Sequence, residues 1–229
     1  MDGLGWLGGD IHGKRLLCLA AGGGKHGPLY AAAGANVTVV DISPAMLELD
    51  RQVAAERRLA LRTVEASMDE LPMLAAGEFD IVIHPVSTCY VPEILPVYRE
   101  VSRVTRGGGL YISQHKSPTS LQTEIQPSAR GYELSEPYYR AGPLPNVVGS
   151  PHREEGTLEY LHRWEEIFGH LCRSGFVIED VVEPLHAKAA EAPGDFGHRS
   201  RFVAPYIRIK ARRVGGSAAA GSSARILLP

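Results

Sequence analysis

The sequence predicts a protein of the α/β class, with a mostly parallel sheet of seven strands and helices on both of its faces. Short apolar runs alternate with segments of helical periodicity through most of the 229 residues. Near-continuous apolar runs such as 37–40 indicate strands that are buried on both sides, as in parallel sheets. The expected strands are 16–20, 37–40, 61–65, 79–83, 110–113, 176–182 and 202–210.

Four helices are expected between these strands. Gly34 is a typical C-terminal cap for a helix over 25–33. Ser43 and Pro44 are a typical N-cap and first helical residue for a helix over 44–58. The other two are expected over 93–104, before the glycines 107–109, and over 158–174, where apolar residues recur at helical spacing.

Residues 116–157 interrupt the alternation. They contain six prolines and no periodic pattern. A segment of this length between strands is typical of a lid or a substrate-binding insertion, and a plain surface loop is the alternative. We therefore expect a single domain over 1–213 that carries this insertion, followed by a Gly/Ser/Ala-rich tail, 214–229, that is expected to be disordered.

The composition excludes several classes of partner. The formal net charge is −2 and no long basic run occurs, so neither nucleic acid nor an anionic membrane surface is expected as a partner. No apolar stretch reaches the ~18 residues of a membrane span, and the first residues do not resemble a signal peptide. The three cysteines are widely spaced, which predicts neither disulfides nor a metal site, and a cytoplasmic location is expected.

The run 16–19 leads directly into a glycine-rich turn at 22–27, and a second apolar run ends on Asp41. Glycines let the backbone approach a ligand closely, and an acid at the end of the second strand can accept bonds from ribose hydroxyls. This arrangement predicts a site for a nucleoside-containing cofactor. The turn also satisfies the pattern G-x-G-x-x-G, so a nicotinamide cofactor stays an alternative at this point.

Two further segments belong to the same order of motifs as the glycine turn and Asp41. They are 65–72 after the third expected strand and 104–110 before the fifth. With them, the chain resembles the class I S-adenosylmethionine-dependent methyltransferases, in particular the small single-domain group that includes ubiquinone, menaquinone and natural-product methyltransferases. The resemblance covers 12–113 well and 158–211 by topology. It implies a Rossmann-like seven-stranded sheet with one late antiparallel strand, S-adenosylmethionine as cofactor, and methyl transfer to a small-molecule acceptor.

The resemblance also implies which residues bind the cofactor. These are Ala20, Gly22, Gly24, Asp41, Ile42, Met46, Ser67, Met68, His84 and Pro85. The first three correspond to the turn around the methionine portion, Asp41 to the ribose acid, the next four to the surroundings of the adenine, and the last two to positions beside the sulfonium. Cys18, Ala20 and Ser67 depart from the family, which usually has an acid, a glycine and an acid at these positions.

Methyl transfer from a sulfonium needs in-line alignment, and it needs a base only when the acceptor enters protonated. His84 and His115 stand at the carboxyl ends of the fourth and fifth expected strands, the sheet edge where α/β proteins bind ligands. They and Tyr90 are the catalytic candidates. The alternative for each is a structural role at a strand end.

The favoured function is a methyltransferase acting on a small molecule. Two other functions remain open at this point: an NAD(P)-dependent oxidoreductase, and a nucleotide-fold binding protein without catalysis. The expected partner is a small-molecule acceptor, without nucleic acid or membrane insertion, and a homodimer is compatible with these features.

Overall fold

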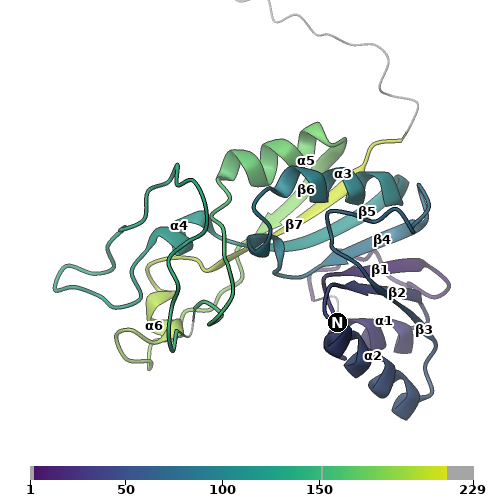
Figure 1. Ribbon diagram of the computed structural model, residues 1–229, viewed down its shortest axis with the longest axis horizontal. Helices are drawn as coiled ribbons and strands as arrows, with labels where there is room; N and C mark the ends of the chain where they lie inside the picture. Colours follow the sequence, from purple (N-terminus) through teal and green to yellow (C-terminus); the bar gives the residue numbers. More distant parts are fainter. Residues whose placement is uncertain (1–2, 151, 216–229) are drawn as a thin grey trace, which may run out of the picture.

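The computed structural model describes residues 3–150 and 152–215. They form a seven-stranded sheet in the order β3-β2-β1-β4-β5-β7-β6 (Figure 1). Neighbouring strands are parallel except around β7, which runs antiparallel to β5 and β6. This confirms the predicted Rossmann-like sheet with one late antiparallel strand. The strands are β1 Arg15–Leu19, β2 Asn36–Asp41, β3 Leu61–Glu65, β4 Phe79–His84, β5 Thr105–Lys116, β6 Phe176–Val182 and β7 Tyr206–Arg213.

The alternation of side chains along the strands creates two apolar cores, one on each face of the sheet. Leu17 and Leu19 of β1 lie in the core that also contains Tyr98 of α3. Leu16 points to the other face and lies in the core with Tyr30 of α1. Figure 1 shows α3 and α5 covering one face and α1 and α2 the other. The helices are α1 His26–Ala32, α2 Pro44–Arg57, α3 Ile94–Val104, α4 Pro118–Gln122, α5 His170–Arg173 and α6 Phe196–Arg199.

The helix expected over 158–174 is wrong in its first part. Residues 158–163 are not helical, and a short π-helix at Glu165–Gly169 continues into α5. The backbone of the non-helical part bonds elsewhere: Tyr160 N donates to Cys89 O at 2.7 Å, and Leu144 N donates to Glu159 O at 2.7 Å. These bonds to distant segments replace the helical ones, so tertiary pairing overrides the local periodicity.

Two strands differ from their expected bounds. β5 begins at Thr105, earlier than expected, because Thr105 pairs with Phe79 before a register shift that brings Leu110 opposite Ile81. β7 begins later than the expected 202, because residues 202 and 203 donate their N–H groups to the carbonyl of Arg199 in the turn after α6.

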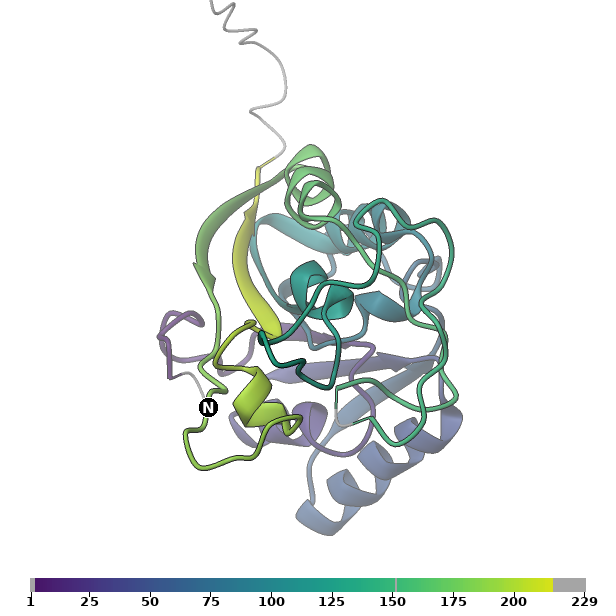
Figure 2. The same ribbon diagram turned by 90° about the vertical axis from the view of Figure 1, so that its left-hand side faces the viewer.

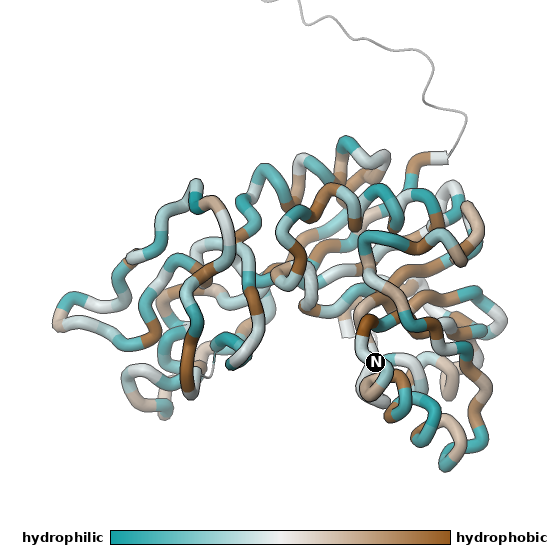
Figure 3. The backbone as a smooth tube through the Cα atoms, in the orientation of Figure 1, coloured by the Kyte–Doolittle hydropathy of each residue, from teal (hydrophilic) through white to brown (hydrophobic). Residues whose placement is uncertain are grey.

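Beyond the carboxyl ends of the strands lies a second lobe, which we call the acceptor-side lobe (Figure 1, left, and Figure 2). It consists of residues 117–150, 152–163 and 183–205 and contains α4 and α6. The lobe therefore includes the expected insertion and also a later stretch between β6 and β7. The apolar stretches of the chain are concentrated in the sheet and its helices, while the lobe is mostly hydrophilic (Figure 3). Of the tail expected over 214–229, residues 216–229 lie outside the described residues.

Arg199 holds the two parts of this lobe together. Its side chain, 2% exposed, comes from α6 and donates to the backbone carbonyls of Ser120, Thr123 and Glu124 at 2.6, 2.7 and 2.9 Å, and to the Ser120 hydroxyl at 2.9 Å. These carbonyls lie at the end of α4, where helices leave carbonyls without partners. One buried guanidinium thus caps α4 and fixes it to α6.

Candidate functional site

The backbone of the loop between β1 and α1 has a conformation and a packing that require glycine at several positions. Gly23 and Gly24 have φ angles of 114° and 72°, in the left-handed region that favours glycine. A Cβ on Gly22 would lie 2.7 Å from Cβ of Met46 and 3.0 Å from the carboxylate of Asp41. Ala20, at the position where the family usually has a glycine, also has a positive φ of 46°. The backbone at Ala20 therefore adopts a left-handed conformation that glycine would adopt at a lower cost.

Asp41 ends β2 directly beside this loop. Its Oδ2 accepts a hydrogen bond from Gly22 N at 2.8 Å, and its Oδ1 accepts one from Ser43 N at 2.9 Å. A carboxylate oxygen can accept more than one hydrogen bond, so both oxygens keep capacity for the hydroxyls of a ribose. The two backbone bonds fix the orientation of the carboxylate at the carboxyl edge of the sheet.

Asp50 of α2 supports this loop, and the sequence pattern did not indicate it. It is fully buried, and its Oδ2 accepts a hydrogen bond from Gly23 N at 3.0 Å. Burial raises the pKa of this carboxyl, against the opposing effect of its bonds to the Gly24 and Gly23 backbone. Asp50 follows Leu47 and precedes Ala54 on the buried side of α2. A lone acid on an apolar helical stripe was the signal that could have found it.

Cys18 cannot supply the acid that the family usually has at its position. It is fully buried in β1, and burial raises the pKa of its thiol, with a further contribution from the charge of Asp50. The carboxylate that contacts the glycine loop here is therefore Asp50 of α2, and β1 contributes none.

Of the residues expected around the adenine, Ile42 follows β2 and Met46 lies in the first turn of α2. Ser67 and Met68 lie in the segment after β3. Ile42 and Met46 are exposed apolar side chains, 70% and 44% accessible, whereas Met68 is buried. The hydroxyl of Ser67 donates to the carboxylate of Asp69. Asp69 therefore supplies an acid two residues after the position where the family usually has one. The sequence contains Asp69, but its pairing with Ser67 is visible only in the structure.

His84 ends β4 and is buried with both ring nitrogens occupied. Its Nδ1 lies 2.8 Å from the Tyr111 hydroxyl and its Nε2 lies 2.8 Å from the Ser87 hydroxyl. Burial lowers the pKa of His84 to about 3, so the ring is neutral near pH 7. His84 and Pro85 both line a cavity of about 530 Å³, described below.

His115 and Tyr90 lie elsewhere. His115 is buried on the other face of β5, where Nδ1 lies 2.9 Å from the Thr88 hydroxyl and Nε2 lies 2.8 Å from the Ser113 hydroxyl. Burial lowers the pKa of His115 well below its usual value. The Tyr90 hydroxyl donates to Glu154 at 2.9 Å. The structure therefore brings His84 and Pro85 to the cavity, whereas neither His115 nor Tyr90 lines it.

These buried histidines predict a loss of stability in mild acid. In the unfolded chain the ring of His84 binds a proton below its usual pKa of 6.5, whereas in the folded protein it does so only near 3. Stability therefore falls as the pH drops below about 6.5, and His115 and His162 act in the same direction. From His84 alone we expect a loss of about 2 kcal/mol at about pH 5, measured by urea unfolding at several pH values. A free energy of unfolding that stays constant over this range would contradict the assignment.

The cavity of about 530 Å³ is enclosed by the amino-terminal segment, α1 and the ends of β4, β5 and β7. Trp6 anchors the amino-terminal segment, since its Nε1 donates to Asp180 of β6 at 2.9 Å. The lining residues are Gly3, Leu4, Trp6, Leu7, His26, Leu29, Tyr30, Ile83, His84, Pro85, Ile112, Ser113, Gln114 and Arg208. The cavity lies beside the glycine loop, from which His26 begins α1.

Comparison with known proteins identifies the family. A family model described as a methyltransferase domain matches residues 17–113. A Bacillus subtilis protein named uncharacterized methyltransferase YbaJ is 35% identical over 177 residues, which cover 76% of this chain and 69% of that protein. The chain belongs to the S-adenosylmethionine-dependent methyltransferases. This confirms the predicted reaction class and the predicted cofactor. The two alternative functions, an oxidoreductase and a non-catalytic binding protein, are therefore not retained.

Two further comparisons show the same fold and another similar protein. The structure of an S-adenosylmethionine-dependent methyltransferase from Mesorhizobium loti has the same fold, with a TM-score of 0.70, 22% identity, and coverage of 90% of this chain and 93% of that chain. A ubiquinone biosynthesis O-methyltransferase from Bordetella avium is 28% identical over 117 residues, 50% of this chain and 48% of that protein.

The residues of the methyltransferase fit its cofactor. A side chain on Gly22 would fill the space beside Asp41, and the Asp41 carboxylate keeps acceptor capacity at the same place. The residues matched by the family model run from β1 to β5 and include every cofactor-binding position predicted above. No helix in the described ranges, 3–150 and 152–215, is long and apolar enough to cross a membrane.

Proposed function

We propose that the methyltransferase acts on a small-molecule acceptor that binds in the cavity of about 530 Å³. The observation that carries the proposal is the place and size of this cavity at the carboxyl ends of β4 and β5. Pockets of 300–1,000 Å³ are typical of sites for small ligands. The lining combines apolar side chains with a few polar groups, among them Gln114 and Arg208. Such a lining can bury an organic acceptor and still fix its orientation.

The proposed cofactor site lies next to this cavity. Ala20, Gly22 and Gly24 would surround the methionine portion, and Asp41 would accept hydrogen bonds from the ribose. The adenine would be flanked by Ile42, Met46, Ser67 and Met68. The exposure of Ile42 and Met46 supports this assignment, because large apolar side chains at the edge of a site offer a surface to a flat ring. His84 and Pro85 would lie between cofactor and acceptor.

When bound, the cofactor supplies an activated methyl group on a positively charged sulfur. The chain must then hold the acceptor in line with that methyl group and exclude water. Trp6, Leu7 and Tyr30 cover the cavity, which supports a role in excluding water. The Ser87 and Tyr111 hydroxyls fix the neutral ring of His84, which would then help to position the acceptor in the cavity.

His84, His115 and Tyr90 remain the candidates for a proton acceptor. His84 has the best position, since it lines the cavity. Each candidate must leave a present partner to accept a proton. His84 must leave the hydroxyl of Tyr111 or Ser87, and His115 that of Thr88 or Ser113. The Tyr90 hydroxyl must leave Glu154. The cytoplasmic location and the homodimer stay predictions.

The proposal predicts that filling the cavity blocks methyl transfer without harming cofactor binding. Leu29, which is 45% exposed and lines the cavity, is replaced by tryptophan. We expect Leu29→Trp to lower transfer by about tenfold or more, because the larger ring displaces the acceptor. Transfer is measured with radiolabelled S-adenosylmethionine in a bacterial extract divided into small-molecule and macromolecular fractions, and cofactor affinity by calorimetry with S-adenosylhomocysteine.

The matched control is Val177→Trp, at a similarly exposed position on β6 that does not line this cavity. This variant is expected to behave like the original protein. Label that appears only in the macromolecular fraction, or transfer that is unchanged in Leu29→Trp, would overturn the small-molecule proposal.

A further inference from the structure

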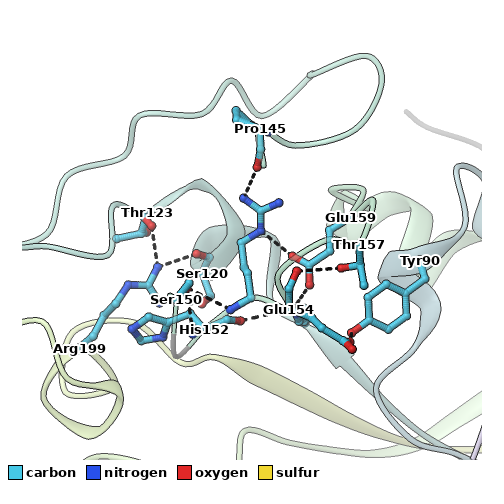
Figure 4. Close-up of polar contacts among 12 residues, drawn as sticks. Tyr90, Ser120, Thr123, Pro145, Ser150, His152, Glu154, Thr157, Glu159 and Arg199 are labelled. Carbon is cyan, nitrogen blue, oxygen red and sulfur yellow. Dashed lines mark hydrogen bonds and ion pairs between the residues drawn. The ribbon is translucent and has the colours of Figure 1, made fainter. Parts of the chain in front are cut away.

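A second cavity, of about 260 Å³, lies inside the acceptor-side lobe, next to the residues drawn in Figure 4. It is enclosed by the α4 region, residues of 145–147 and 152–153, α6 and the start of β7. The lining residues are Lys116, Ser120, Leu121, Thr123, Glu124, Ile125, Ser135, Glu136, Pro145, Val147, His152, Arg153, Phe196, Arg199, Pro205 and Tyr206. The methyltransferase family model, which ends at residue 113, does not extend to this cavity.

Three cations line this cavity, and they share few carboxylates. Lys116 and Arg153 both contact the single carboxylate of Glu159, which is fully buried. Arg199 donates only to backbone carbonyls and to the Ser120 hydroxyl, so none of its hydrogen-bond acceptors is a carboxylate. Buried charges are normally paired, because removing a charge from water is costly.

The acids that line the cavity do not compensate for these cations. The Glu136 carboxylate is engaged by Arg140 at 2.6 Å, within the lobe. Glu124 is exposed to solvent, although its charge acts on Arg199 from a distance. Including Glu159 and Arg140, the cluster contains four cations and three carboxylates, which leaves a positive balance.

His152 adds an unused hydrogen-bonding group. Its ring stacks on Phe196 with 5.2 Å between the centroids, and both ring nitrogens are buried without a hydrogen-bond partner among the described residues. The carbonyl of Gly194 favours the protonated ring but does not lie at hydrogen-bond geometry. Burial, followed by the charges of Arg199 and Lys116, lowers the pKa of His152 to about 4. The neutral ring can donate one N–H to an acceptor in the cavity.

The two cavities lie along the same face of the β5–β7 pair. Gln114 pairs with Arg208, and both line the larger cavity. Lys116 pairs with Tyr206, two residues further along the ladder, and both line the smaller one. Side chains two residues apart on a strand share a face and lie about 7 Å apart. A molecule in the larger cavity can therefore extend toward Lys116.

We propose that the smaller cavity binds an anionic group, a carboxylate or a phosphate, carried by the methyl acceptor. This inference rests on the proposed function, since it names the chemical class of the same small molecule. The anion would receive charge-assisted hydrogen bonds from Lys116 and Arg153 and an N–H from His152. It would also compensate for the charge of Arg199.

The test compares anionic probes with a neutral probe of the same shape. The full chain is saturated with S-adenosylhomocysteine, so that the cofactor site is filled, and is titrated with benzoate, phenyl phosphate and benzamide. We expect benzoate or phenyl phosphate to bind about tenfold more tightly than benzamide, because only the anions gain charge-assisted bonds. The preferred anion distinguishes a carboxylate site from a phosphate site. Equal binding of the three probes overturns the proposal, and this comparison needs no variant.

Two variants are expected to change the affinity for benzoate in opposite directions. Glu159→Gln keeps the size of the side chain and removes the carboxylate that Lys116 and Arg153 share. It should tighten benzoate binding by about tenfold, whereas His152→Phe, which keeps the ring on Phe196, should weaken it. A merely structural role for Glu159 would not increase anion affinity. Arg201→Gln removes an exposed cation two residues from Arg199 and should change nothing.

Nuclear magnetic resonance separates this inference from the proposed function. The probes should shift the signals of His152, in the smaller cavity. Shifts at His152 together with methyl label only in macromolecules would reject the small-molecule acceptor and retain the anion site. Shifts confined to Gln114 and Arg208 would reject the anion site and retain the larger cavity as an acceptor site.

Discussion

Replacement of Asp41 by alanine is expected to weaken the binding of S-adenosylhomocysteine by about 100-fold. The variant removes the two charge-assisted hydrogen bonds that we propose between Asp41 and the ribose, which together contribute about 3 kcal/mol. It also removes the acceptor for Gly22 N at 2.8 Å and for Ser43 N at 2.9 Å. The carboxylate that joins the glycine loop to the start of α2 is therefore lost. Calorimetry with S-adenosylhomocysteine measures the effect, and Asp41→Asn should give an intermediate loss.

Glu65 provides a matched control for Asp41. It ends β3, the neighbouring strand, and pairs with Asp41 in the sheet, but it is exposed. Glu65→Ala should bind S-adenosylhomocysteine as the original protein does. If both alanine variants bind normally, the ribose does not lie at the end of β2 and the proposed cofactor site must be moved.

Replacement of Arg199 by methionine is expected to lower the free energy of unfolding by about 3 kcal/mol or more. The variant leaves the carbonyls of Ser120, Thr123 and Glu124 without their donor, and a buried acceptor without a partner costs about 1–3 kcal/mol. Urea unfolding measures the loss. Limited proteolysis should cut the acceptor-side lobe first, because α4 is no longer held against α6.

The control is Arg201→Met, on an exposed arginine of the same segment, which should leave stability within about 0.5 kcal/mol. Arg199→Lys should fall between the two, because an ammonium cannot reach all four acceptors that the planar guanidinium serves. Binding of S-adenosylhomocysteine should survive in Arg199→Met, since the proposed cofactor residues lie outside the lobe. A variant as stable as the original protein would show that the α4 carbonyls find other donors.

The sheet was predictable because its signals are local. The strands β1, β2 and β4 contain apolar runs. Ser43, whose hydroxyl accepts from Met46 N at 3.3 Å, caps α2 as the residue type predicts. Residues 158–163 were not predictable in the same way. Their apolar spacing is helical, but their backbone bonds to residues that are far away in the sequence, and periodicity contains no information about such partners.

In the candidate site, too, some features follow from the local sequence and others depend on contacts between distant segments. The positions of Gly22 and Asp41 follow from their spacing, because a short loop and a strand end bring them together. The support from Asp50 requires the contact between α2 and the glycine loop, and the burial of His115 depends on which face of β5 it occupies. A strand end places a residue near the edge of the sheet, but it does not decide whether its side chain faces a cavity or the core.

The position of β7 has a consequence for the order in which the chain acquires structure during synthesis. β7 is the last strand of the described residues, yet it lies between β5 and β6 and bonds to both. Until residues 206–213 have left the ribosome, β6 has no neighbour in the sheet and β5 has an open edge. The glycine loop and Asp41 belong to strands that can pair much earlier. A nascent chain could thus assemble its cofactor half first, while Tyr206 and Arg208 complete both cavities only at the end.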